Sequence, residues 1–474
     1  MRRGKPVTIG SAIRSYQPEI VKHIQALIRI RSVASESLPG WPFGEGIAQA
    51  LHYMLDLGAS MGFRTANVDG YAGHVEYGDG EELVAVLVHL DTVPEGTGWT
   101  YDPFGAEIHN GRIYGRGASD DKGPAVVALY ALKAIKDLGI NPKKRIRIIF
   151  GTNEENGMTD MDYYFAREPF PDYAFTPDAA YPIIHAEKGY YVFRMKRQHT
   201  VAERDRRILE MAGGVAPNVV PEHCRTIIAV TDAEPEELER IVLLAEENPQ
   251  IDAILTKEGR VEITAVGKSG HGSYPPSGIN AISHMAAFLH MIGGIVPEDE
   301  FWRFIRTAIG FEAFGESLGL ACNDPVHGRL TVNLAQVRLD EKTAEAILNV
   351  RYPVTTDGET VLAKLRQKAA GYGVEVEVTA FMAPLFVPPD HTLIRKLGRA
   401  YEAIMGEKAE LLSIGGGTYA RKLQNRGVAF GAGFRGTDTK AHQPDEFVGI
   451  EDMMLHGEIC TQAIYELIRT EEER

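Results

Sequence analysis

Residues 83–88 read LVAVLV, and the next six residues, 89–94, read HLDTVP. An unbroken apolar run of this length is typical of a strand that is buried on both faces, as in a parallel sheet covered by helices. His89 and Asp91 follow that run at once, spaced by one residue. In open α/β sheets, ligands bind outside the carboxyl ends of the strands. This one stretch therefore predicts a fold class and a candidate position for a site. On the His89–Asp91 pattern alone, a structural histidine with satisfied hydrogen bonds is the simpler explanation.

The segments that flank this strand alternate between helix and strand patterns. Apolar residues at helical spacing predict helices over 18–30, 46–61 and 122–138, the last of them closed by Gly139. A second apolar run at 145–150 predicts another strand. This β-α-β order indicates an α/β domain with a mixed, mostly parallel sheet and helices on both faces.

The pattern changes near residue 188. Strand-like runs then alternate with helices, including an aromatic-rich helix predicted over 301–318, in an order that indicates α+β structure with antiparallel pairing. The α/β pattern returns near residue 384. We therefore expect a first domain in two parts, 1–187 and 384–474, interrupted by an inserted domain at 188–383.

Composition and charge restrict the classes of partner. The 474 residues carry a formal charge of −15, so the chain lacks the cationic surface that attracts nucleic acid or anionic lipid. No apolar run reaches the roughly 18 residues that a membrane span needs. The cysteines Cys224, Cys322 and Cys460 are scattered, which favours a reduced compartment. We expect a cytoplasmic protein with neither nucleic acid nor membrane as partner.

Two pairs of adjacent carboxylates stand at element boundaries. Asp120 and Asp121 open a predicted helix after a glycine-rich turn, where helix capping is the simpler explanation for one of them. Glu154 and Glu155 follow the predicted strand 145–150, and the alternative there is a solvated turn. A cation would relieve the repulsion within the second pair, with one carboxylate as ligand and the other as base for a metal-bound water.

Asp178 and His442 are unremarkable alone, but they complete a set. Together with His89, Asp120 and the glutamate pair they give the mixed nitrogen and oxygen donors that suit zinc or manganese. Two metals could each take one histidine and one terminal carboxylate while Asp120 bridges them. Metals about 3.5–4 Å apart would share a hydroxide and bind both oxygens of a tetrahedral intermediate.

The motifs and their order resemble those of the co-catalytic zinc exopeptidases. They are HLDTVP at 89–94, GRGASDDKG at 115–123, NEE at 153–155, TPD at 176–178 and AHQP at 441–444. That family includes carnosinase, acetylornithine deacetylase, succinyl-diaminopimelate desuccinylase and the bacterial dipeptidase peptidase V. The resemblance covers essentially the whole chain.

The resemblance implies a role for each motif residue. The implied metal ligands are His89, Asp120, Glu155, Asp178 and His442. Asp120 would bridge the two ions, Glu154 would be the general base, and Asp91 would orient His89. The Asp120–Asp121 peptide bond is cis in relatives, and we expect the same here.

The resemblance further implies that the inserted domain is a lid over the catalytic domain. His271, within SGHGSYP at 269–275, matches the histidine that donates to the developing oxyanion, although the sequence alone allows an ordinary loop histidine. Arg351 resembles the arginine that binds the free carboxylate of the substrate, with a surface ion pair as the alternative. The backbone of the turn at 416–418, that is Gly416, Gly417 and Thr418, is expected to assist it. Asn218 is expected to add a lid contact.

The inserted domain is nearly twice as long as one simple lid requires. A doubled lid resembles peptidase V, in which the extra half substitutes for a dimer partner. We therefore expect a monomer in which His271 serves the active site of its own chain.

These observations predict a metallo-dipeptidase that hydrolyses the peptide bond of small unblocked peptides through a hydroxide bridging two divalent metal ions. Zn²⁺ is the first expectation, and Mn²⁺ suits the same ligands. An N-acyl amino-acid deacylase would use the same site and is the alternative. A non-catalytic metal-binding or peptide-binding protein is a remote one, because all five ligand positions and the base are filled.

Overall fold

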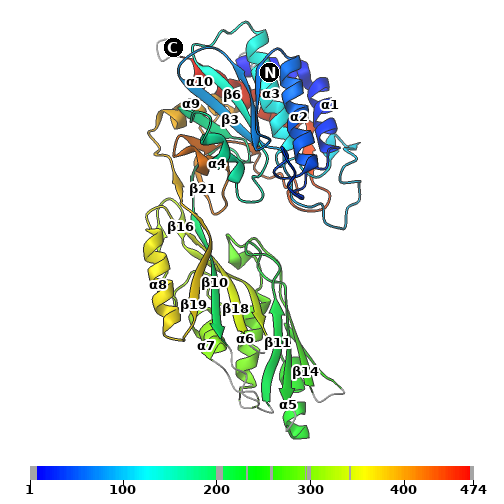
Figure 1. The fold of residues 1–474 in the computed structure, drawn as a ribbon, viewed down its shortest axis with the longest axis vertical. Coiled ribbons are helices and arrows are strands. Elements are labelled where there is room, and N and C mark those ends of the chain that lie inside the picture. The colour runs from blue at the N-terminus through cyan, green and yellow to red at the C-terminus, as the bar shows by residue number, and fades with distance from the viewer. Residues whose placement is uncertain are drawn as a thin grey trace, which may run out of the picture. The chain divides into compact units, whose positions relative to one another are not determined.

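The computed structural model describes residues 8–198, 206–230, 233–256, 260–293, 295, 300–340 and 343–469. The chain forms two compact units, of which the first comprises residues 1–186, 385–413 and 417–474, and the second residues 187–384 and 414–416 (Figure 1). The second unit covers the predicted inserted domain. It also takes in the short segment 414–416, which the sequence analysis had assigned to the first domain.

The first unit is built on a nine-stranded sheet with the order β1-β2-β6-β3-β7-β22-β9-β20, and β21 pairs with β9. Its centre is parallel, because β3 pairs in parallel with β6 and β7, and β22 with β7, whereas β1, β2 and β9 pair antiparallel. The predicted mixed sheet is confirmed. The strands are β1 (Arg64–Val68), β2 (Ala72–Tyr77), β3 (Leu83–His89), β6 (Arg145–Gly151), β7 (Tyr173–Thr176), β9 (Ile183–Glu187), β20 (Leu385–Phe386), β21 (Leu411–Ile414) and β22 (Gly427–Ala429).

Helices cover this sheet. All seven residues of β3 are buried, and since successive side chains point to opposite faces, both faces of the sheet are covered there. Figure 1 shows α1, α2 and α3 side by side on the first unit. The helices of the unit are η1 (Ile9–Tyr16), α1 (Gln17–Ile28), α2 (Glu45–Ser60), α3 (Lys122–Asp137), α4 (Thr159–Phe165), α9 (Thr392–Met405), η4 (Tyr419–Leu423) and α10 (Ile450–Ile468).

The predicted helices of the first domain are present, with ends shifted by one or two residues. Helix α3 is apolar around most of its circumference and packs against α1, α10 and β3. It stops before Gly139, whose φ of 72° is the left-handed conformation that glycine adopts most easily. No helix in the described part of the chain is both long enough and apolar enough to span a membrane.

Two small sheets lie at the edge of the first unit. The strands β24, β5 and β4 form one of them, and β8 pairs in parallel with β23 in the other. They connect loops that are distant in the sequence, which matters for the site below. Their bounds are β4 (Ile108–His109), β5 (Arg112–Tyr114), β8 (Ala179–Ala180), β23 (Ala432–Gly433) and β24 (Phe447–Gly449).

The second unit contains an eight-stranded sheet with the order β13-β14-β12-β11-β17-β18-β10-β19, and its pairs are antiparallel, as predicted. The strands are β10 (Gly189–Gln198), β11 (Arg206–Gly213), β12 (His223–Val230), β13 (Ile251–Leu255), β14 (Arg260–Val266), β17 (Thr331–Leu339), β18 (Thr343–Tyr352) and β19 (Glu375–Met382). The remaining elements are α5 (Pro235–Glu246), η2 (Pro275–Ser277), α6 (Ala281–Met291), α7 (Glu300–Phe304), η3 (Ile305–Ile309), β15 (Asn323–Asp324), β16 (Gly328–Arg329) and α8 (Gly358–Ala370).

One predicted helix of this unit was wrong in length. The aromatic-rich segment 301–318 is helical only as far as Ile309, because Gly310 takes a φ of 53° and ends the helix. The apolar residues beyond it, such as Leu318, still pack into the core, but from a loop. Apolar spacing alone did not distinguish the two conformations.

His456 lies in the middle of α10 and is fully buried. Its Nδ1 is 2.8 Å from the hydroxyl of Tyr181, and its Nε2 has no hydrogen-bond partner. Burial lowers the pKa of His456 to about 3. The imidazole is therefore neutral in the folded protein at neutral and mildly acidic pH.

The contribution of His456 to the unfolding free energy should fall as the pH drops from 7 to 5. The unfolded chain takes up a proton at His456 near pH 6.5, whereas the folded chain does not until about pH 3. This one group lowers stability by about 2 kcal/mol over that interval. In urea titrations at both pH values, the change in unfolding free energy from pH 7 to pH 5 should be more positive by that amount in His456→Phe than in the unmodified protein, whereas the exposed control His52→Phe should match the unmodified protein. An unchanged pH dependence in His456→Phe would contradict the assignment.

Candidate metal centre

The side chains of the candidate site meet at one edge of the first sheet. β3 lies between β6 and β7, all three in parallel, so their carboxyl ends point the same way. His89 is the last residue of β3 and stands opposite Gly151 of β6. Glu154 and Glu155 follow β6 by a few residues, and Asp178 follows β7. The predicted location at the strand ends is therefore the one that the fold provides.

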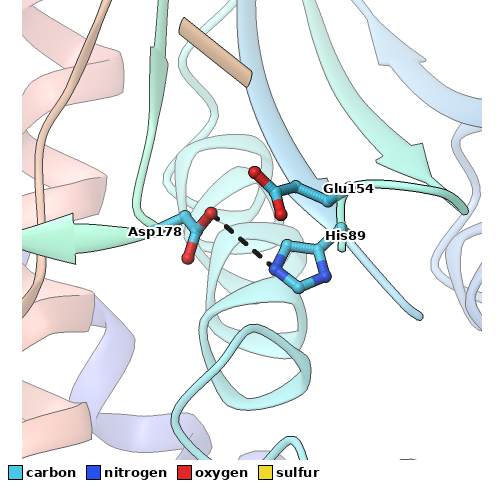
Figure 2. A group of neighbouring side chains, drawn as sticks. All are labelled: His89, Glu154 and Asp178. Carbon is cyan, nitrogen blue, oxygen red and sulfur yellow. Dashed lines mark ion pairs between the residues drawn. The ribbon is translucent and has the colours of Figure 1, made fainter. Parts of the chain in front are cut away.

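Six of the predicted residues form two groups, and within each group the donor atoms lie within 4.8 Å of one another. In Figure 2 the imidazole of His89 faces the carboxylate of Asp178, 3.7 Å from Nε2 to Oδ2, with the Glu154 carboxylate beside them. The first group is His89, Glu154 and Asp178, and the second is Asp120, Glu155 and His442.

Asp120 connects the two groups. Its Oδ1 is 3.0 Å from Nε2 of His89, and its Oδ2 is 3.0 Å from Nε2 of His442. His442 Nε2 also lies 2.9 Å from Oε1 of Glu155. A carboxylate that reaches both histidines with separate oxygens has the geometry that a bridging ligand requires. The ligand roles themselves stay predictions.

The electrostatics of the pocket favour cations. Burial raises the pKa of Glu155 to about 7 and of Asp178 to about 6, and the neighbouring Asp120 carboxylate adds to both shifts. Burial also raises the pKa of Glu154 well above its ordinary value, and its Oε1 is buried without a hydrogen-bond partner. Divalent cations would offset the repulsion among these carboxylates. Two imidazoles with several carboxylates suit zinc or manganese, so the residues fit the predicted pair of ions.

Asp91 sets the orientation of the site by two kinds of contact. Nδ1 of His89 is 3.0 Å from the main-chain oxygen of Asp91 and 3.5 Å from its carboxylate. Donation to that main-chain oxygen leaves Nε2 as the nitrogen that faces the carboxylates, where it is available to a metal ion. The Asp91 carboxylate instead accepts the backbone N–H groups of Glu154 and Glu155, each at 3.1 Å. Asp91 is a positioning residue, because it acts through its neighbours.

Asp160 is a second positioning carboxylate, which the sequence analysis missed. It is fully buried in α4, and its Oδ2 accepts the backbone N–H groups of Thr152 at 2.7 Å and Asn153 at 3.1 Å. The buried hydroxyl of Tyr419 donates to the same oxygen. Asp160 and Asp91 thus bind four consecutive backbone N–H groups, those of residues 152–155. The loop that presents Glu154 and Glu155 is fixed from both sides.

Glu446 is a third such carboxylate, also missed. The Glu446 side chain is fully buried. Its Oε1 accepts hydrogen bonds from the backbone N–H and the hydroxyl of Ser119, both at 3.0 Å. Its Oε2 accepts hydrogen bonds from the backbone N–H of Gly117 at 3.1 Å and from the guanidinium of Arg116 at 2.7 Å. Because Glu446 follows His442 by four residues, it joins the loop of Asp120 to the loop of His442. No spacing rule predicts this contact.

Two backbone features shape the ligand loops. His442 has a φ of 64°, a left-handed conformation that is uncommon outside glycine and that aims its side chain back at the site. The Asp120–Asp121 peptide bond is cis, as predicted. The buried carboxylate of Asp121 accepts the backbone N–H of His89 at 3.1 Å.

The predicted lid residues lie in the second unit, where several of them are linked by short contacts. His271 is exposed, and its Nδ1 is 2.6 Å from the hydroxyl of Ser273. The backbone N–H of Gly272 donates to the main-chain oxygen of Asn218 at 2.7 Å. The buried Asn333 donates to the main-chain oxygen of Val219 at 2.9 Å and so fixes the Asn218 loop beside His271.

Arg351 belongs to the same region of the second unit. It stands opposite Thr331 in the sheet, and Thr331 donates to the main-chain oxygen of Ser273 at 3.1 Å. Nη1 of Arg351 donates to the main-chain oxygen of Gly415 at 3.2 Å. The adjacent Gly416 is part of this unit, whereas Gly417 and Thr418 belong to the first. The hydroxyl of Thr418 accepts the Ala420 N–H at 3.2 Å and caps η4, a use that the sequence analysis did not foresee.

Sequence comparison places the chain in a known group. Residues 85–466 match the family model described as peptidase family M20/M25/M40. The chain belongs to this peptidase family. The resemblance that the motifs indicated is therefore confirmed, and the protein is a peptide-bond hydrolase. All the residues of the candidate metal centre lie within the matched range.

Individual relatives cover nearly the full length of this peptidase. A putative dipeptidase, YtjP, from Bacillus subtilis is 38% identical over 95% of this chain and 97% of its own length. A Beta-Ala-Xaa dipeptidase from Lactobacillus delbrueckii is 35% identical over 96% of this chain and 97% of its own length. Human carnosine dipeptidase 1 shares the fold, with a TM-score of 0.60 at 14% identity over 98% of this chain and all of that one.

Asp160→Ala should weaken both stability and turnover of this peptidase. The substitution leaves the buried N–H groups of Thr152 and Asn153 without an acceptor, which costs about 1–3 kcal/mol each. The unfolding free energy from urea titration should fall accordingly, and kcat should fall more than KM rises, because the loop that carries Glu154 loosens.

The matched control is Asp162→Ala, two residues along the same helix, whose carboxylate is largely exposed and pairs with Lys422. It should change neither quantity appreciably. Equal effects of the two variants would contradict the positioning role of Asp160.

Proposed function

We propose that this peptidase is a metal-dependent dipeptidase that cleaves the peptide bond of small unblocked peptides. The observation that carries the proposal is the arrangement around Asp120, whose carboxylate contacts a histidine in each of two adjacent donor groups. Beside these groups lies Glu154, which is not a predicted ligand and has a buried carboxylate oxygen without a hydrogen-bond partner. This is the arrangement that two-ion hydrolysis needs.

The ligands divide between two divalent ions, Zn²⁺ by preference or Mn²⁺. His89 and Asp178 would hold one ion, His442 and Glu155 would hold the other, and Asp120, which lies between the two histidines, would contribute to both. When bound, such ions polarise the peptide carbonyl and make water a nucleophile at neutral pH. The oriented imidazole of His89 and the fixed 152–155 loop present these donors without rearrangement.

Glu154 moves the proton. Burial among carboxylates raises its pKa well above its ordinary value, so that it is a stronger base than an exposed glutamate. Its carboxylate takes the proton of the attacking water and gives it to the leaving amine. The hydrogen bond from its own backbone N–H to Asp91 fixes the side chain at the strand end.

The substrate class rests on the relatives. Two of them, at 38% and 35% identity over nearly the whole chain, are described as a putative dipeptidase and a Beta-Ala-Xaa dipeptidase. Their descriptions favour a dipeptide over an N-acyl amino acid.

The second unit serves as the lid. His271 donates to the developing oxyanion, with the Asn218 loop beside it. Arg351 pairs with the free carboxylate of the dipeptide through its planar fork, and the backbone of Gly416, Gly417 and Thr418 assists. Closing such a lid would exclude water and select substrates with both termini free.

The protein acts as a monomer in the cytoplasm. An eight-stranded lid sheet is large enough to contain both halves of a doubled lid, which supports the monomer. The free thiols of Cys224, Cys322 and Cys460 support a reducing compartment. Sedimentation analysis of the metal-loaded protein tests whether it is a monomer.

Chelation should abolish dipeptide hydrolysis, and Zn²⁺ or Mn²⁺ should restore it. Glu154→Gln should bind the same amount of metal, measured by elemental analysis, while kcat falls by at least about 10²–10⁴-fold because the proton acceptor is lost. The exposed control Glu36→Gln should keep both metal and activity. Chelator-resistant activity, or faster cleavage of acetylated amino acids than of any dipeptide, would overturn the proposal.

Arg351→Lys should raise KM for a dipeptide about tenfold, since a point charge replaces a bidentate donor and roughly one charged hydrogen bond is lost. KM for the same dipeptide with an amidated C-terminus should not change, because that substrate offers no carboxylate. Arg338→Lys, an exposed site in the same unit, is the control. Equal shifts for both substrates would remove Arg351 from carboxylate recognition.

A further inference from the structure

A cavity of about 280 Å³ opens in the first unit directly beside the metal centre. Its wall includes Asp120 and Asp178, which belong to one ligand group each. A water molecule occupies about 30 Å³ in the liquid, so the cavity has room for a large amino-acid side chain. The metal centre and this cavity are therefore continuous within one unit.

The wall beyond the two aspartates is mainly apolar. Ala180 of β8 and Gly433 of β23 stand opposite each other in the short sheet, and both line the cavity. The lining also includes the larger apolar residues Phe434, Val448 and Met453. Small residues at the strand pair keep the space open, while the larger ones give it an apolar lining. Such a lining binds an apolar side chain by removing it from water.

One further carboxylate, besides those of Asp120 and Asp178, lies in the wall of this space. Asp452, in the first turn of α10, lies in the wall, and no lysine, arginine or histidine among the described residues pairs with it. Unlike Asp120 and Asp178, it is not a predicted metal ligand, so its charge is not offset by an ion. An acidic side chain entering the cavity would meet this carboxylate and be repelled.

We propose that this cavity is the specificity pocket for the residue on the carbonyl side of the cleaved bond, and that it selects apolar over acidic side chains. The inference rests on the proposed dipeptidase function, which assigns the carboxylate end of the substrate to Arg351 of the second unit. The cavity contains residues of the first unit only. The residue left for it is the N-terminal one, whose carbonyl must lie at Asp120 and Asp178.

The test compares kcat/KM for Leu-Gly, Gly-Gly, Gly-Leu and Asp-Gly on the metal-loaded full chain. Leu-Gly should exceed Gly-Gly by tenfold or more, in the range that an apolar pocket provides. Ala180 is exposed at the rim, so Ala180→Phe should fold normally and fill the space. In that variant the Leu-Gly to Gly-Gly ratio should fall at least tenfold, while the Gly-Leu to Gly-Gly ratio should stay constant.

Asp452→Asn should raise the Asp-Gly to Gly-Gly ratio several-fold. The size-matched control Ala59→Phe, on the exposed end of α2, should leave every ratio and rate unchanged. Hydrolysis with ratios that Ala180→Phe does not alter, or a change confined to Gly-Leu, would overturn the pocket and leave the dipeptidase standing. Absence of hydrolysis of all four dipeptides by the unmodified protein would overturn the dipeptidase proposal itself.

Discussion

The structure of the site follows from one electrostatic constraint, the burial of several carboxylates within a few ångströms of one another. The cluster consists of Asp120, Glu154, Glu155 and Asp178. Burial raises the pKa of Glu154, Glu155 and Asp178, because the folded protein disfavours their ionised forms. Only Asp120, between two imidazoles, has its pKa lowered. A cluster of this kind persists because the rest of the fold stabilises it and because cations would balance it.

The stabilising elements are backbone contacts more than side-chain pairs. Asp91 and Asp160 hold four consecutive N–H groups of one ligand loop, and Glu446 holds those of another. Each of these carboxylates exchanges the solvation of a charge for several hydrogen bonds from main-chain donors, which are strong when the acceptor is ionised. The same contacts restrain the loops and so hold the donor atoms at their spacing.

The sequence was informative where a short local pattern of residues indicates a structure or a family. The run LVAVLV and the polar residues after it located β3 and His89, and motif order identified the family. Asp160, Tyr419 and Glu446 could not be found in this way, because each acts on residues far from its own position and has no characteristic neighbour. The end of the helix at Ile309 was missed because apolar periodicity continues past Gly310. Tertiary contacts and backbone conformation, not composition, decided these points.

The order in which the candidate ligands occur along the chain has a consequence for biosynthesis. His89, Asp120, Glu155 and Asp178 emerge from the ribosome early, whereas β22, which completes the sheet beside β7, and the segment with His442 and Glu446 come after the whole second unit. A nascent chain thus exposes an acidic half-site with neither its second imidazole nor the carboxylate that orders the Asp120 loop. The candidate metal centre is therefore complete only once the segment that follows the second unit has joined the first sheet.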